Sequence, residues 1–114
     1  MTNLVSKRNP RNKMKLHVEN GKVYTFKLNS GEELVTKVID STDEYVEIED
    51  PVSVAPGPQG MGLVPSMFTA DPDIKPKLNN RSVSMYSPTD DSVRMKYIEM
   101  ITGITVPDKK ILVG

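Results

Sequence analysis

Apolar and polar residues alternate along three neighbouring stretches in the first half of the chain. These stretches are 22–29 (KVYTFKLN), 33–40 (ELVTKVID) and 45–55 (YVEIEDPVSVA). Because successive side chains of a β-strand point to opposite faces, a period of two predicts three strands. The side chains expected to share a face are Tyr24, Phe26 and Leu28 in the first strand, Leu34, Thr36 and Val38 in the second, and Val46, Ile48, Val52 and Val54 in the third.

Turn residues separate these strands and favour an antiparallel arrangement. Asn29-Ser30-Gly31 lies between the first two strands, and Gly31 can adopt the positive φ that a tight turn requires. The polar run 41–44 separates the second strand from the third. Pro51 lies inside the third stretch, and because proline donates no ladder hydrogen bond, it marks a bend, a bulge or an edge.

The second half of the chain is richer in proline and glycine and predicts two further strands. The stretch 62–70 (GLVPSMFTA) carries apolar residues on both faces, which indicates contact with the core and with a partner at once. A fifth strand is expected over 81–87 (RSVSMYS). The connecting segments 55–62 (APGPQGMG) and 70–81 (ADPDIKPKLNNR) are predicted to be loops.

A helix start signal follows the fifth strand and predicts an α-helix over about 88–102. Ser87 suits the N-cap, Pro88 the first helical position and Asp90 the first turn, where a carboxylate favours the positive end of the helix dipole. Gly103 is placed to end the helix. The apolar face is expected to comprise Val93, Tyr97, Met100 and Ile101, with Ile98 at its margin.

The chain of 114 residues suits one domain. We therefore predict a mostly β fold, a strongly bent five-stranded antiparallel sheet followed by a C-terminal helix. Its parts are a basic N-terminal arm at 1–15, the sheet and helix at 16–103, and a tail at 104–114 with an Ile-Leu-Val cluster.

The charges are distributed unevenly, although their sum is zero. The arm contains five basic residues and no acidic residue. Since the chain totals 15 basic and 15 acidic residues, residues 16–114 contain 10 basic and 15 acidic residues, a net charge of −5. Nucleic-acid affinity depends on cations that neutralise phosphates, so such a partner is expected to contact the arm rather than the acidic body.

The sequence contains little that points to catalysis. There is no cysteine, which indicates a reducing compartment, and His17 is the only histidine. Asp71 and Asp73 lack the spacing of a calcium loop, and no glycine-rich loop has the context of a phosphate site. No apolar run reaches the roughly 20 residues of a membrane span. We expect no enzyme activity, no catalytic residue, no metal ion, no cofactor and no membrane partner.

The stretch 24–50 resembles the first motif of Sm and Sm-like proteins. In that motif two alternating strands flank a Gly turn, and a third strand ends in an acidic pair. The matching residues are Tyr24, Phe26, Leu28, Gly31, Leu34, Val38, Asp43, Val46, Ile48, Glu49 and Asp50. The order of segments over most of the chain is similar to small Sm-like proteins of marine cyanophages and ocean metagenomes, which carry the helix at the C-terminus.

This resemblance implies a small barrel that pairs a strand with a strand of the next copy to form a ring. Closure of the ring would remove exposed strand edges, and we expect the ring to contain about five to seven copies. It also implies that the protein is located in the cytoplasm of an infected bacterial cell. We expect the seam at the fourth and fifth strands, and the candidate residues are Leu63, Val64, Met67, Phe68, Val83 and Met85.

The chain departs from the Sm pattern where that family binds RNA. Thr36 replaces a common Gly, Tyr45 stands nearest to the position of the base-holding Asn, and the polar stretch 70–81 replaces the second motif. Tyr45 is a candidate for stacking on a base. The other candidate nucleic-acid residues are Lys7, Arg8, Arg11, Lys13, Lys15, Lys75, Lys77 and Arg81.

Two functions remain open from the sequence. The first is a non-enzymatic ring that binds single-stranded nucleic acid, in particular RNA, in phage RNA or DNA processing. The second is a phage structural or assembly subunit whose arm and strand edges bind neighbouring protein, which would place it in the virion.

Overall fold

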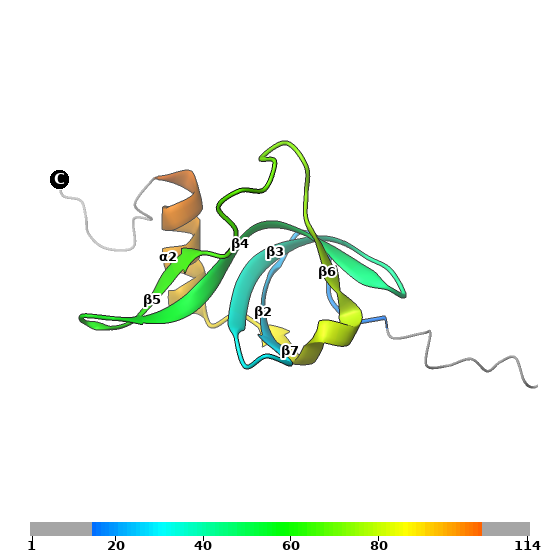
Figure 1. Ribbon diagram of the computed structural model, residues 1–114, viewed down its shortest axis with the longest axis horizontal. Helices are drawn as coiled ribbons and strands as arrows, with labels where there is room; N and C mark the ends of the chain where they lie inside the picture. The colour runs from blue at the N-terminus through cyan, green and yellow to red at the C-terminus, as the bar shows by residue number, and fades with distance from the viewer. Residues whose placement is uncertain (1–14, 104–114) are drawn as a thin grey trace, which may run out of the picture.

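The computed structural model describes residues 15–103, which form one bent antiparallel sheet and one C-terminal helix (Figure 1). The strands are β2 (Val23–Leu28), β3 (Glu33–Ser41), β4 (Tyr45–Gly57), β5 (Gly60–Pro65), β6 (Lys77–Asn79) and β7 (Val83–Pro88). A 3₁₀ turn, η2 (Asn80–Ser82), joins β6 to β7, and the helix is α2 (Asp91–Thr102). The prediction of a mostly β, antiparallel fold with a C-terminal helix is confirmed.

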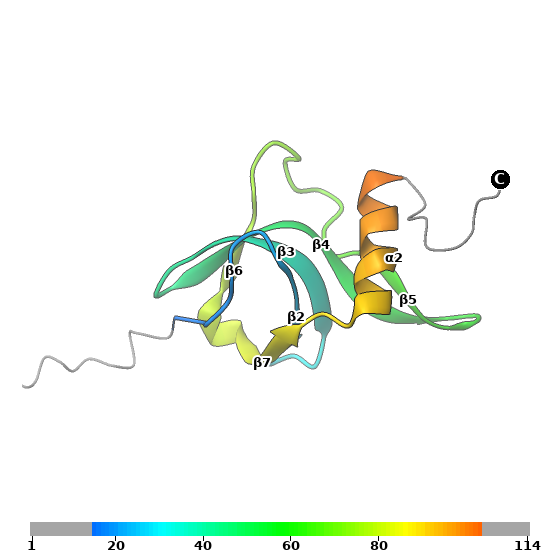
Figure 2. The same ribbon diagram turned by 180° about the vertical axis from the view of Figure 1, so that it is seen from behind.

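The sheet has the strand order β5-β4-β3-β2-β7, with the short strand β6 paired to the first part of β4. Within residues 15–103, β5 and β7 each pair with one neighbouring strand only, so the sheet curves without closing. Figure 2 shows this curvature from behind, with α2 at one end of the sheet and η2 towards the other. The two edge strands are therefore open along one side.

The turn between β2 and β3 forms where the sequence predicts it. Gly31 has a φ of 96°, and its N–H donates to the Leu28 carbonyl over 2.8 Å. Phe26 then pairs with Leu34 across the two strands. At the next turn the Thr42 hydroxyl accepts hydrogen bonds from the N–H groups of Glu44 and Tyr45, which fixes the start of β4.

A bulge in β4 explains how one strand serves two apolar clusters. Val38 pairs with Ile48, whereas Val35 pairs with Val52, so β4 contains one residue more than β3 between these pairs. Asp50 lies in this interval and adopts a φ of 54°. Because strand side chains alternate, one extra residue transfers the rest of β4 to the opposite face.

The prediction that the apolar residues of β4 share one face is therefore wrong. Val46 and Ile48 face the concave interior, whereas Val52 and Val54 face the helix. The bend that Pro51 indicates is present, and the positive φ of Asp50 beside it changes the alternation.

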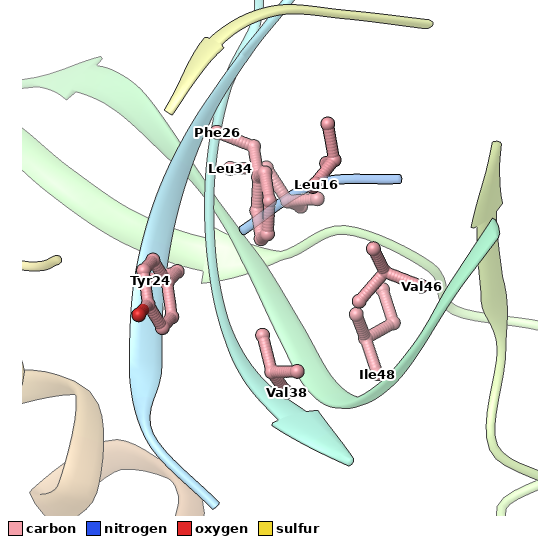
Figure 3. Packing of buried hydrophobic residues seen from close by; sticks show 7 residues of the cluster. All are labelled: Leu16, Tyr24, Phe26, Leu34, Val38, Val46 and Ile48. Carbon is pink, nitrogen blue, oxygen red and sulfur yellow. The ribbon is translucent and has the colours of Figure 1, made fainter. Parts of the chain in front are cut away.

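The first cluster fills the concave side of the sheet (Figure 3). Its fully buried side chains include Phe26, Val38 and Val46, which come from three different strands. Leu16, which precedes β2, also packs into this cluster. The remaining members are Tyr24, Leu34 and Ile48. The predicted inward face of β2 is confirmed, since Tyr24 and Phe26 are buried and Leu28 packs against them.

The second cluster joins α2 to the opposite face of β3 and β4. Tyr97 is fully buried against Val35 and Val52. Val93, Ile98 and Ile101 pack around it, as the helical period predicts. Met100, also expected on this face, is instead exposed.

Two predicted boundaries in the middle of the chain are wrong. Most of the predicted loop 55–62 belongs to the β4–β5 hairpin, with Pro58-Gln59 as its turn and Gly60 at a φ of 104°. The predicted strand 62–70 ends at Pro65, and Met67 and Phe68 lie in the following loop. Proline and glycine at a tight hairpin turn look like an open loop when only composition is considered.

Two further predictions fail because the backbone hydrogen bonds form at other positions than expected. The predicted loop 70–81 contains β6, because Ile48 N–H donates to the Pro76 carbonyl and the chain then runs beside β4. The N-cap of α2 is Asp90 rather than Ser87. Ser87 and Pro88 remain in β7, where Pro88 pairs with Tyr24.

Candidate functional site

The β6 end of the sheet brings together two predicted nucleic-acid residues. Tyr45 of β4 pairs with Asn79 of β6. Two residues further along the same pair of strands, Lys77 lies opposite Glu47. The Lys77 ammonium lies 5.4 Å from the centre of the half-buried Tyr45 ring, within the range of a cation–π contact. We call this pair the Tyr45–Lys77 platform.

Acidic side chains accompany the cations around the platform. Lys75 Nζ lies 3.8 Å from a Glu49 carboxylate oxygen, and Lys37 Nζ lies 4.0 Å from the other. Lys77 stands opposite Glu47 in the strand register. Since these carboxylates offset the lysine charges, the platform offers an aromatic face with little net positive charge.

Arg81 lies in a shallow hollow of about 280 Å³ beyond the platform. Asp43, Glu44 and Asn79 form the rest of its lining. The Asn79 side chain accepts a hydrogen bond from Arg81 N–H over 2.9 Å, which fixes the backbone of η2. The predicted basic group Lys75, Lys77 and Arg81 is thus dispersed among acids.

The first described residues lie beside the end of β3. Lys15 is exposed, and the following Leu16 carbonyl accepts a hydrogen bond from the Ser41 hydroxyl at the end of β3. The exposed His17 donates its N–H to the Tyr86 hydroxyl over 2.9 Å. Lys7, Arg8, Arg11 and Lys13 lie outside the described residues, so their relation to Tyr45 stays a prediction.

The six predicted seam residues fall into two groups. Leu63 packs against the helix cluster and Val83 against the interior cluster, so both contribute to the fold itself. The other four, Val64, Met67, Phe68 and Met85, are exposed. Phe68 is 81% exposed and Met85 65% exposed.

A groove at the other end of the molecule is absent from the sequence predictions. It has a volume of about 350 Å³ and lies between the loop after β5 and the C-terminal half of α2. Its apolar lining includes Val52, Met67, Ile74, Met100 and Ile101. We call it the helix–loop groove. The helical period assigns Met100 to the core, and its exposure beside the groove is known only from the structure.

A second hollow of about 480 Å³ lies on the other side of α2. It is lined by β5 residues Met61 and Leu63 and by Val93 and Met100 of the helix. The helix therefore covers only part of the sheet face, and apolar side chains remain accessible on both sides of it.

Tyr97 connects the helix to the β4 bulge through its hydroxyl. The hydroxyl donates to the Glu49 carbonyl over 2.9 Å and accepts from the Lys37 N–H over 3.1 Å. Burial raises the pKa of Tyr97 to about 12, because the phenolate form would lose its hydration. The Thr36 hydroxyl also donates to the Glu49 carbonyl, over 2.9 Å. Tyr97 and Thr36 thus satisfy backbone groups that the bulge removes from the ladder.

Residues 15–103 lack two other features, a cluster of metal-binding side chains and a membrane-spanning helix. These residues contain no group of three or more acidic or histidine side chains that could hold a metal ion. In the same range no helix is long and apolar enough to cross a membrane.

A scan against protein-family models finds no match to this chain, and a search of curated proteins finds none either. The resemblance to Sm-like proteins therefore rests on the residues of the chain.

Proposed function

We propose that the protein is a non-enzymatic, Sm-like subunit that assembles into a closed ring through strands β5 and β7. The observation that carries the proposal is the pair of open edges at the two ends of one curved sheet. Each edge strand has six residues, so the two can pair along their whole length in neighbouring copies. Open edges favour association unless they are paired or protected.

Exposed apolar side chains along these edges support the same assembly. Val64 lies on β5 and Met85 on β7, and both are exposed. A ring buries them against a neighbouring copy, and burial of apolar surface favours association by about 25 cal/mol for each Å². Closed rotational symmetry leaves no edge free.

Native mass spectrometry at micromolar concentration tests the ring. We expect a single closed oligomer of about five to seven copies. Val64→Lys and Met85→Lys are expected to yield monomer, because a lysine on an edge strand opposes pairing. Met100→Lys, the same change at an exposed methionine outside the edges, serves as the control and should assemble. A monomer from the unaltered chain contradicts the proposal.

Single-stranded nucleic acid is the ligand that we propose for the ring. The Tyr45–Lys77 platform favours it, because an aromatic face beside a cation suits stacking of an unpaired base. Residues 1–15 supply five cations and no acidic residue, whereas residues 16–114 carry a net charge of −5. The alternative is a phage assembly subunit, in which the basic arm binds the acidic body of a neighbour. We place both roles in the infected bacterial cell, and the second extends to the virion.

A gel-shift assay with single-stranded RNA and DNA of mixed sequence separates the two roles. If all five arm cations bind phosphates, log K falls with log salt with a slope of about −3.5 per subunit. Removal of 1–15 should abolish that slope. Tyr45→Ala should weaken binding by about 5- to 150-fold, whereas Lys96→Ala on α2 should not. Absence of salt-sensitive binding contradicts the nucleic-acid role, and loss of the ring without the arm favours the assembly role.

A further inference from the structure

The helix–loop groove combines exposed apolar side chains with acidic ones. Its lining is mixed, and it includes three exposed apolar side chains, Met67, Ile74 and Met100. Ile74 is 62% exposed although it is a large aliphatic residue. Figure 1 shows the loop before β6 rising beside the C-terminal end of α2, so the groove lies close to where the described chain ends.

Acidic groups dominate the charged part of the groove lining. Glu49, Asp50 and Asp71 contribute three carboxylates, against the single ammonium of Lys75. Glu49 already lies within 4.0 Å of Lys37 and Lys75. Asp50 and Asp71 are exposed, so they can attract a basic segment of an apolar ligand.

The sequence that follows α2 matches both properties. Residues 104–114 (ITVPDKKILVG) combine Lys109 and Lys110, which outnumber the single acid Asp108, with the apolar run 111–113. They begin directly after Gly103, and Ile101, two residues earlier, lines the groove. An extended chain of 11 residues spans up to about 36–40 Å, so the apolar run can return to the groove with chain to spare.

We propose that residues 104–114 of the chain occupy the helix–loop groove of the same molecule. The apolar run 111–113 lies over Met67, Ile74 and Met100, and Lys109 and Lys110 face Asp50 and Asp71. A short tether gives an effective concentration of about 1 mM. A segment that binds with a dissociation constant on the order of 100 µM as a free peptide is then about tenfold more often bound than free.

A peptide-binding experiment on two forms of the protein tests this proposal. The forms are the full chain and a chain that ends at Gly103, and the probe is a fluorescent peptide of residues 104–114. Fluorescence anisotropy should show saturable binding to the shortened chain. The full chain should bind the peptide about tenfold more weakly, because its own segment competes.

Matched variants locate the site. In the shortened chain Ile74→Asp should abolish peptide binding, whereas Met61→Asp, at a similarly exposed apolar residue outside the groove lining, should leave it unchanged. A peptide with Leu112→Asp should not bind. A peptide with Lys109→Glu and Lys110→Glu should bind several-fold more weakly at low salt, and this difference should shrink as salt screens the charges.

Three results overturn the proposal. One is the absence of saturable binding by the shortened chain up to about 1 mM peptide, the effective concentration of the tether. Another is equal binding by the Ile74→Asp variant. The last is self-association of the full chain that Ile74→Asp removes, since the occupant of the groove would then be a second copy. None of these results depends on whether the edge strands form a ring.

Discussion

At the scale of single residues, the Tyr97 hydroxyl connects the two halves of the structure. It is the only tyrosine hydroxyl among residues 15–103 seen to bond two backbone groups, the Lys37 N–H and the Glu49 carbonyl. Both groups lie beside the bulge, where the ladder between β3 and β4 shifts register. The helix thus contributes hydrogen bonds to the sheet as well as apolar contact.

Tyr97→Phe should therefore destabilise the protein by about 1–3 kcal/mol, the cost of leaving the Lys37 N–H unsatisfied, since the Glu49 carbonyl keeps the Thr36 hydroxyl as a donor. Urea denaturation followed by circular dichroism measures this cost. Tyr45→Phe is the control, because the half-buried Tyr45 keeps its ring beside Lys77; it should change stability by less than about 0.5 kcal/mol. Equal stability of the two variants would show that the Tyr97 hydroxyl bonds add nothing.

The raised pKa of Tyr97 also predicts a pH dependence. The phenol ionises near 10.0 when exposed and at about 12 when buried, so the unfolded state releases its proton first. The contribution of Tyr97 to stability is complete below pH 10 and is lost as the pH rises to 12. The stability difference between the unaltered chain and Tyr97→Phe should narrow over this range in urea titrations. A stability difference between the two proteins that stays constant from pH 9 to pH 12 would contradict this pH dependence.

At the scale of elements, the bulge in β4 requires a residue that tolerates positive φ. Asp50 has a φ of 54°, which short polar side chains adopt more readily than branched ones. Asp50→Val should destabilise the protein by about 1–2 kcal/mol, whereas Asp50→Gly should leave stability unchanged or raise it. Thermal or urea unfolding of both variants gives the comparison. Equal effects of Val and Gly would mean that the bulge relaxes at no cost.

The start of α2 provides a second test at this scale. Asp90 accepts hydrogen bonds from Ser92 N–H and Val93 N–H, and the Ser92 hydroxyl bond holds the pKa of Asp90 below its usual value. Asp90→Ala should therefore lower the unfolding midpoint, because these helix donors lose their partner. Ser87→Ala should have little effect, since the Ser87 hydroxyl bonds only the Pro88 carbonyl among the described residues. A larger fall of the unfolding midpoint in Ser87→Ala than in Asp90→Ala would assign the N-cap to Ser87.

At the scale of the whole molecule, stability should be concentrated in one part of the sheet. Strands β2 and β3 are paired on both sides and carry most of the interior cluster. Strand β5 is paired on one side and most of its residues are exposed. Local opening is therefore expected at β5 before β2 and β3.

Hydrogen exchange should reveal that contrast in dilute protein. Amides of β2 and β3 should exchange slowest, and amides of β5 and of 66–76 fastest. If copies pair through β5 and β7, protection of these two strands should rise with protein concentration, while that of β2 and β3 changes little. Protection of β5 equal to that of β3 in a monomeric sample would contradict the prediction.

Local patterns in the sequence determined the elements whose structure depends on residues close together in the chain. The period of two located β2 and β3, Gly31 located their turn, and the helical period located Tyr97 on the inner face of α2. These features depend on side-chain alternation and on φ preferences, which neighbouring residues largely fix. The resemblance to Sm-like proteins, the nucleic-acid ligand and the ring remain proposals that such patterns motivate.

The tertiary structure alone decided how those elements share the apolar residues. Because of the extra residue at Asp50, Val52 faces the helix whereas Ile48 faces the interior. The polar segment around Lys77 forms a strand because it pairs with β4. The helix–loop groove likewise arises because α2 and the loop around Ile74 meet from distant positions in the chain. Strand register and packing between distant segments depend on long-range contacts, which no local alternation of apolar and polar residues encodes.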